Sequence, residues 1–303
     1  MSRTSVAWFL ALFSLFSPSP GGTQTPSSGM RNPAKNQAIL HLKAERSSPL
    51  DLEVAGNLAG FFQGSKAYLR RGDLLTLPQV EFTVSNDANL PQTVKVRGVE
   101  LELLANELAA VREHVLIVAI CKDYYRAFYP QGYREIHRPV LVLEVNGQPS
   151  SAWPKGKAGN SLGPYLITHE NFAPTYKILA HQEEPQIPWG VVRLEFEDER
   201  TAFTTIAPRG ADADNPDVQY GFRIAQQNCL RCHANSDERT KGTITWSAMA
   251  IMAARSPQQF AAYVKHPTSF SANSEMPANP GYDDATLQAL ITYFSTFAPP
   301  GTK

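Results

Sequence analysis

One short segment constrains this chain more than any other, the run Cys229-Leu230-Arg231-Cys232-His233, in which two cysteines precede a histidine. The only other cysteine among the 303 residues is Cys121, so a framework of disulfides is excluded. A zinc site is disfavoured because a tetrahedral ion needs four ligands and there is no second cysteine pair. A thioredoxin-like redox pair is the remaining alternative, although in such proteins a strand precedes the cysteines and the histidine is not required.

Two cysteines two residues apart and followed directly by histidine form the pattern that attaches c-type haem. The thiols of Cys229 and Cys232 would form thioethers with the porphyrin vinyl groups. The imidazole of His233 would then bind the iron as its proximal ligand. The sequence therefore predicts one covalent haem c.

The sixth iron ligand is predicted to be Met276, which lies in the loop Ser274-Glu275-Met276-Pro277 just before the last expected helix. A thioether in such a loop can be held against the open face of the haem. His266 and an open coordination site are the alternatives. Met249 and Met252 lie in an alanine-rich apolar stretch and are interpreted as core packing.

The first 22 residues predict a signal peptide. Arg3 supplies positive charge, residues 6–16 are apolar apart from one serine, and a Ser-Pro-Gly segment follows. The apolar run is short for a bilayer span. Export to the periplasm is therefore expected, with a retained membrane anchor or an N-terminal core helix as alternatives. Covalent haem agrees with export, because c-type haem is attached outside the bacterial cytoplasm in known families.

Composition and length indicate a globular chain of two domains. Hydrophobic residues make up 43% and charged residues 18%, and 28 basic side chains match 28 acidic ones. Because these charges balance, no net positive charge favours nucleic acid or acidic lipid as a partner. Taking roughly 100 to 200 residues per domain, the expected organisation is a tether at 23–48, a mixed β-rich domain at 49–206, a linker at 207–215 and an all-α domain at 216–303. The expected fold class is α+β.

The spacing of apolar residues predicts the elements within these domains. Strands are expected at 80–84, 93–96, 115–120, 140–145 and 191–196, and a helix at 98–108. Further helices are expected to begin after Asn215, after Ser256 and near Asp283 or Asp284, because these residues are suited to helix N-termini.

The segment 218–298 resembles the class I cytochromes c. It contains a helix leading into the haem motif, a middle helix, a Met-Pro loop and a closing helix. The resemblance implies an all-α fold in which Gly221 and Phe222 meet Tyr293, Phe294 or Phe297. Lys241-Gly242-Thr243 stands where the family often has a Gly-Pro pair, so the carbonyl that accepts from His233 is left open.

A second, less specific resemblance relates residues 74–197 to the molybdopterin-binding fold of the sulfite-oxidase family. It implies a molybdopterin cofactor with Cys121 as the molybdenum ligand, although Lys122-Asp123 departs from the expected context. The alternative is an ordinary, partly buried thiol. The segments that carry the resemblance are Leu77-Pro78-Gln79-Val80, Val96-Arg97-Gly98-Val99-Glu100-Leu101, Ala119-Ile120-Cys121-Lys122-Asp123-Tyr124-Tyr125-Arg126, Pro139-Val140-Leu141-Val142-Leu143-Glu144-Val145-Asn146-Gly147 and Leu162-Gly163-Pro164-Tyr165.

Two hypotheses for function follow. In the first, the chain is an electron carrier rather than an enzyme, exchanging single electrons with periplasmic donor and acceptor proteins. Its N-terminal domain would dock a partner, with the polar and aromatic group at 123–129 as the expected surface. In the second, a molybdenum centre at Cys121 oxidises a small substrate such as sulfite and passes electrons to the fused haem, where covalent linkage raises the effective concentration.

Overall fold

Short segments rich in valine, isoleucine and leucine build residues 52–198 into one mixed β-sheet. Its order is β2-β1-β9-β8-β7-β4-β3, with β5 pairing with both β6 and β9. Strands β1 and β9 are parallel, whereas β5 runs antiparallel to β6 and β9. The strands are β1 (Leu52–Gly56), β2 (Lys66–Leu69), β3 (Val80–Val84), β4 (Val94–Glu100), β5 (Val115–Cys121), β6 (Arg126–Tyr129), β7 (Val140–Val145), β8 (Tyr165–Thr168) and β9 (Trp189–Asp198).

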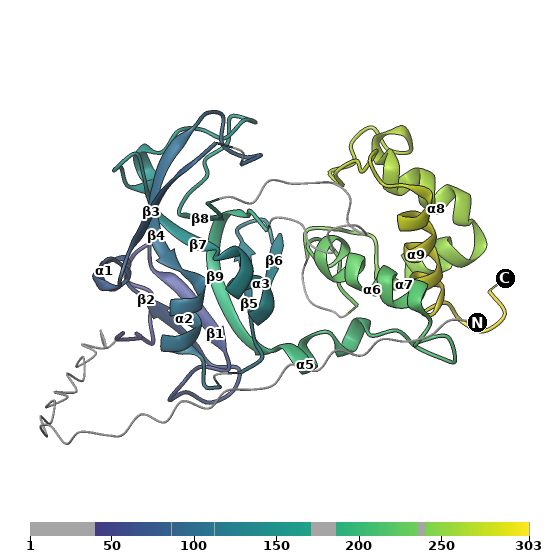
Figure 1. Cartoon of the computed structure of the whole chain (residues 1–303), viewed down its shortest axis with the longest axis horizontal. Coiled ribbons are helices and arrows are strands. Elements are labelled where there is room, and N and C mark those ends of the chain that lie inside the picture. The colour runs from purple at the N-terminus through teal and green to yellow at the C-terminus, as the bar shows by residue number, and fades with distance from the viewer. Residues whose placement is uncertain (1–39, 86, 112, 171–185, 236–239, 303) are drawn as a thin grey trace, which may run out of the picture. The chain divides into compact units, whose positions relative to one another are not determined.

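The structure is a computed structural model that describes residues 40–85, 87–111, 113–170, 186–235 and 240–302 (Figure 1). The predicted signal peptide, 1–22, and positions 23–39 of the predicted tether lie outside the described residues. Residues 38–303 belong to one compact unit.

Helices accompany the sheet and make up much of the chain after it. Those within or directly after the sheet region are α1 (Arg71–Thr76), α2 (Leu101–Leu108), α3 (Gln131–His137) and α5 (Glu199–Ala202), with 3₁₀ turns η1 (Ser150–Ala152) and η2 (Thr204–Ile206). The later ones are α6 (Pro216–Ile224), the π-helical turn η3 (Ala225–Cys229), α7 (Trp246–Arg255), α8 (Pro257–Lys265), the 3₁₀ turn η4 (Pro267–Ser269) and α9 (Asp284–Ser295).

One buried side chain, that of Arg134, connects α2 and α3 to the sheet through three contacts. Arg134 of α3 is 1% exposed and pairs with Glu102 of α2 at 2.8 Å. Its guanidinium also donates to the carbonyl oxygens of Val115 and Tyr129, at 2.5 and 2.7 Å. These bonds satisfy a buried charge, which would otherwise be costly to take out of water. One side chain thus ties α2 and α3 to β5 and β6.

All three predicted helix starts are confirmed, since α8 begins at Pro257 directly after Ser256, although the Ser256 side chain makes no cap hydrogen bond. At the other two starts a side chain caps the helix. The Asn215 side chain accepts from the Asp217 N–H at 2.9 Å at the start of α6. The Asp283 carboxylate accepts from the Thr286 N–H at 2.8 Å at the start of α9. Such caps satisfy N–H groups that have no partner inside the helix.

Helices α6 and α9 cross at Gly221, as predicted. A Cβ at Gly221 would lie 2.1 Å from the Ala289 carbonyl oxygen, so only glycine lets the two backbones approach this closely. Phe222 stacks on Tyr293, with ring centroids 5.8 Å apart. The predicted contact between the two helices is confirmed.

The predicted fold class is wrong in its second half, because residues 216–303 are not a self-contained all-α class I cytochrome c domain. Helices α6, α7, α8 and α9 share a hydrophobic core with Leu116 and Val118 of β5 and Phe128 of β6. The Tyr293 hydroxyl of α9 also donates to the Ile206 carbonyl at 2.6 Å. A mixed α+β class describes this shared core.

The predicted strands 80–84 and 140–145 are confirmed as β3 and β7, and the other three overlap β4, β5 and β9. The helix predicted at 98–108 begins only at Leu101 because β4 continues to Glu100. Within that strand, a Cβ on Gly98 would lie 2.1 Å from the Leu141 carbonyl oxygen. The glycine therefore serves close strand packing at a register shift, rather than a helix start.

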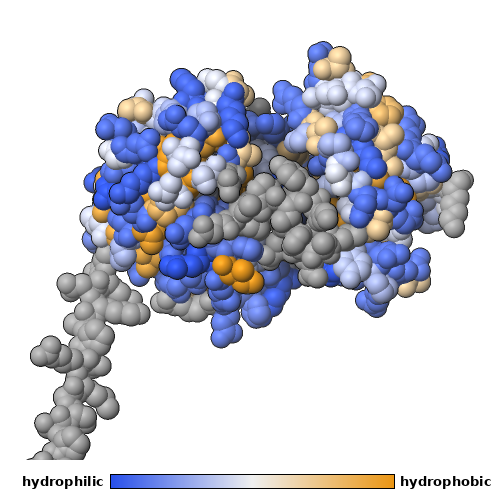
Figure 2. Space-filling view, turned by 45° about the horizontal axis from the view of Figure 1, so that its top comes forward, coloured by the Kyte–Doolittle hydropathy of each residue, from blue (hydrophilic) through white to orange (hydrophobic). Residues whose placement is uncertain are grey.

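The surface shown in Figure 2 is covered mostly by hydrophilic side chains, with apolar ones gathered in smaller patches. Within the described ranges, no helix combines the length and the apolar character that crossing a bilayer requires.

Candidate functional site

The Cys-x-x-Cys-His segment follows directly from a helix. Helix α6 continues into the π-helical turn η3, which ends at Cys229. The N–H groups of Cys232 and His233 both donate to the Cys229 carbonyl, at 3.2 and 2.9 Å, so the five residues form one tight turn. Both cysteines are free thiols. Two thiols and an imidazole therefore share one turn, next to a π-helical turn of the kind often found at functional sites.

One hydrogen bond holds the His233 imidazole in place. The Nδ1 atom lies 2.8 Å from the Ile244 carbonyl oxygen. Because a carbonyl only accepts, Nδ1 carries the proton and the lone pair of Nε2 is left for a metal. Burial lowers the pKa of His233, opposed by the bond to Ile244. The neutral ring, which is the ligating form, is thus favoured, and Ile244 supplies the carbonyl that the sequence left open.

Gly242 fits against the imidazole. Its N–H donates to the Cys232 carbonyl at 2.6 Å. A Cβ at this position would lie 2.7 Å from that carbonyl oxygen and 2.7 Å from the His233 Nδ1 and Cε1 atoms. Sequence reasoning gave Gly242 no role. The only signal was its place in Lys241-Gly242-Thr243, where the related family often has Gly-Pro.

We expect Gly242→Ala to push the His233 ring away from Ile244, because neither the backbone of Cys232 nor the ring can yield without breaking a hydrogen bond. The free energy of unfolding should fall by roughly 1–3 kcal/mol. Urea unfolding measures this, with Gly72→Ala as the control since a Cβ at Gly72 meets no atom within 4 Å. Equal stability of the two variants would contradict the assigned contact.

The thiols of the motif are held protonated. Burial raises the pKa of Cys229 to about 12, with Cys232 adding to the shift and Arg231 opposing it. Burial also raises the pKa of Cys232, while Lys241 and Arg231 lower it and Asp123 and Glu275 raise it. A catalytic dithiol needs a lowered thiol pKa and, in thioredoxin-like proteins, a preceding strand. This site has neither, which disfavours the thioredoxin-like alternative.

The motif is bound to the turn between β5 and β6. The Arg126 N–H donates to the Arg231 carbonyl at 2.9 Å. Lys241 pairs with Asp123 at 2.5 Å. Part of the group at 123–129, which was expected to dock a partner, therefore contacts the chain's own Cys-x-x-Cys-His segment. Sequence reasoning missed this because the two segments lie about a hundred residues apart.

Met276 is half-buried and packs against the same apolar core as Cys229. Its neighbour Glu275 acts electrostatically on Cys232 and Lys241, so the loop lies near the motif. The Asn279 side chain donates to the Pro277 carbonyl at 3.1 Å and steadies the loop. The alternative ligand His266 is exposed at the end of α8. Ligation by Met276 stays a prediction, because Met249 and Met252 pack against the same core.

Cys121 lies at the end of β5, 4% exposed, in the core of the sheet. Burial raises the pKa of its thiol, and Asp123 adds to this while Lys241 opposes it. The neighbouring Lys122 ammonium donates to the Gly163 carbonyl at 3.2 Å. The thiol is therefore neutral and enclosed.

Among the residues that the structure describes, no three or more His, Cys, Asp or Glu side chains are arranged to hold a metal ion. Covalent haem would need only His233 and one further axial ligand on its iron. The sequence matches no protein-family model and no curated protein.

Proposed function

We propose that this protein is an exported c-type cytochrome that carries one covalent haem and transfers single electrons between periplasmic redox proteins. One observation carries the proposal: the His233 ring, directly after two free thiols, is fixed through Nδ1 by the Ile244 carbonyl. This leaves Nε2 as the metal-binding atom. The order Cys-x-x-Cys-His supplies the matching covalent chemistry.

The residues present fit such a haem. Cys229 and Cys232 would hold the porphyrin edge, while His233 and Met276 would bind the iron. A bound haem supplies a reversible one-electron couple. The chain's own contribution is rigid positioning: Ile244 orients the imidazole, Gly242 packs against it, and Asp123 and Arg126 of the sheet region hold the turn.

The proposal is tested on the protein purified from an exporting bacterial host. We expect a pyridine haemochrome spectrum, a mass increment of one porphyrin that persists under denaturing conditions, and about one iron per chain. Fractionation should place the mature protein in the periplasm or, if the N-terminal segment is retained, at the membrane. A colourless protein without added mass would refute the proposal.

We expect Met276→Ala to lower the reduction potential and to change the ferric absorption spectrum, because loss of a thioether ligand favours the ferric state. Redox titration and visible spectroscopy measure both effects. Met249→Ala is the matched control, since Met249 is also half-buried against the same core. If Met276→Ala leaves both observables unchanged, another group holds the sixth position.

The described surroundings of Cys121 do not fit a molybdenum ligand. Its side chain is 4% exposed and is packed among apolar core residues. We therefore derive no step through a molybdenum centre. The metal analysis above also decides this alternative, which about one molybdenum per chain would support.

A further inference from the structure

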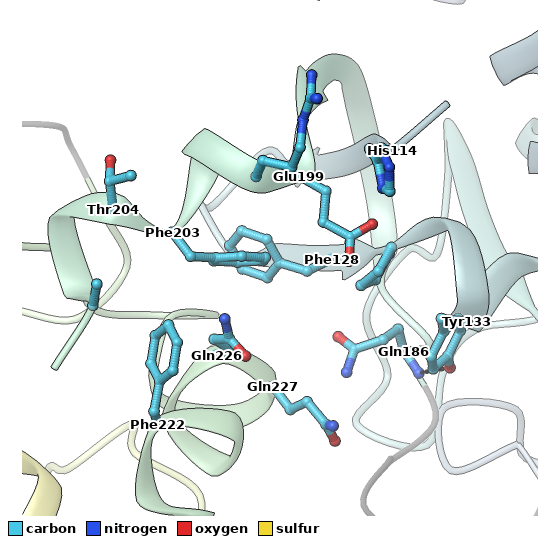
Figure 3. A pocket seen from close by; sticks show the side chains of 13 residues that line it. His114, Phe128, Tyr133, Gln186, Glu199, Phe203, Thr204, Phe222, Gln226 and Gln227 are labelled. Atoms are coloured by element: carbon cyan, nitrogen blue, oxygen red, sulfur yellow. Dashed lines mark hydrogen bonds between the residues drawn. The ribbon is translucent and has the colours of Figure 1, made fainter. Parts of the chain in front are cut away.

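A cavity of about 420 Å³ lies beside the helix that leads to the Cys-x-x-Cys-His segment (Figure 3). This volume is within the range of ligand pockets, roughly 300–1,000 Å³. Residues from β6 and from the segment after α5 line one side, and residues of α6 and η3 line the other. Cys229, Cys232, His233 and Met276 do not line it, so the cavity is distinct from the proposed haem site.

Aromatic rings form much of the cavity wall. Phe128 and Phe203 lie together on one side, with ring centroids 5.9 Å apart and planes inclined by 52°. Phe222 reaches in from α6 and is supported by the stacked ring of Tyr293. Such a wall favours a ligand with its own ring, since aromatic pairs gain stability beyond the area they bury.

Neutral amides provide the polar groups. Gln226 and Gln227 project from η3, and the side chain of Gln186 lies opposite Gln227 (Figure 3). The Gln186 backbone N–H donates to the Tyr133 hydroxyl at 2.8 Å, which anchors that side of the cavity. Each amide offers both donors and an acceptor. A ligand hydroxyl or carbonyl can therefore bond to the amide of Gln226, which lines the cavity.

The charges around the cavity disfavour anions. The Arg200 guanidinium is bound in two places by the Asp198 carboxylate, at 2.5 and 2.9 Å. The Glu199 carboxylate points into the cavity beside Phe128 and accepts from the Gln131 N–H at 3.3 Å. Among the described residues that line the cavity, besides His114, a negative ligand would meet the Glu199 carboxylate and a guanidinium, that of Arg200, which is already paired with Asp198.

We propose that this cavity binds a small neutral aromatic molecule with a hydrogen-bonding group on its edge, of the phenol class. The ring packs between the phenylalanines and the hydroxyl bonds to the Gln226 amide. This inference goes beyond electron transfer. It does not depend on the haem, because aromatic packing and amide hydrogen bonds from the protein are sufficient for binding of the ligand.

Isothermal titration of the purified full chain tests the proposal with three probes of matched ring size: 2-naphthol, 2-naphthoate and trimethyl(2-naphthyl)ammonium. We expect saturable binding of one 2-naphthol per chain, at least roughly tenfold tighter than either charged probe, because a charge loses hydration on entering the cavity. Equal or tighter binding of a charged probe, or no saturable binding of 2-naphthol, would overturn it.

Two substitutions locate the binding. Phe203→Leu and Gln226→Leu should each weaken 2-naphthol binding by roughly fivefold, through loss of ring packing and of an amide partner. Gln258→Leu, an exposed position on α8, is the control and should bind as the wild type does. The haemochrome content of each variant is measured in parallel, since Gln226 precedes Cys229 by three residues. Unchanged binding in Phe203→Leu would contradict this location.

Discussion

Replacing Cys229 and Cys232 together by alanine is expected to abolish covalent haem completely. Thioether bonds form only at these two thiols on the proposed assignment, and His233 alone holds a porphyrin reversibly. The denatured variant should show the mass of the bare chain and no haemochrome signal. Each single substitution should leave at most one thioether.

Cys121→Ala is the matched control because it removes the third thiol without touching the motif. It should retain the full porphyrin mass and lose only the packing of a small buried side chain, roughly 1 kcal/mol. Loss of porphyrin in Cys121→Ala, or its retention in the double variant, would mean that the thiols have been assigned incorrectly.

Much of the local structure was predictable because it depends on neighbours in the sequence. The runs at 80–84 and 140–145 are apolar or β-branched apart from one glutamate each, and they form β3 and β7 at those bounds. Asn215 and Asp283 cap helices through side chains that reach only two or three residues ahead. The Cys-x-x-Cys-His motif is likewise local, and the structure places its parts on one turn.

The parts that sequence reasoning missed depend on contacts between distant segments. The Ile244 carbonyl is one acceptor among many until the fold brings it to His233. The approach of Gly242 to the same ring is visible only in three dimensions. The pairing of Asp123 with Lys241 has the same origin. A sequence shows which groups can bond, but the choice among them is made by the tertiary structure.

The sequence of strand β5 already indicated that the sheet shares a core with the later helices, but the sequence analysis did not use this pattern. Its residues Val115 to Ala119 are all apolar, and they are all buried. Val115 and Ile117 face the sheet core, whereas Leu116 and Val118 face the core formed with the helices. A strand that is apolar at successive positions is buried on both faces. This pattern predicts a second layer over β5, which α6–α9 help to provide.

This arrangement joins the fold to the proposed function. The same hairpin that contributes Leu116, Val118 and Phe128 to the second core also binds the Cys-x-x-Cys-His segment, because the Arg126 N–H donates to the Arg231 carbonyl. The sheet region is therefore part of the support of the motif.

Gly221→Ala is expected to be among the most destabilising single substitutions in the chain. The added Cβ would lie 2.1 Å from the Ala289 carbonyl oxygen and 2.5 Å from the Tyr293 Cβ. Relief requires α6 and α9 to separate, which disrupts the stacking of Phe222 on Tyr293. The free energy of unfolding should fall by roughly 3 kcal/mol, measured by urea denaturation.

The control for Gly221→Ala is the same substitution at Gly132 in α3, where a Cβ would meet no atom within 4 Å. There the change removes only the conformational freedom of glycine, and stability should rise by up to about 1 kcal/mol. If the free energy of unfolding falls for Gly221→Ala and rises for Gly132→Ala, the effect of packing is distinguished from that of helix propensity. If Gly221→Ala also stabilised the protein, α6 and α9 would not cross at this glycine, and the packing of the core that supports the Cys-x-x-Cys-His segment would differ from the one described.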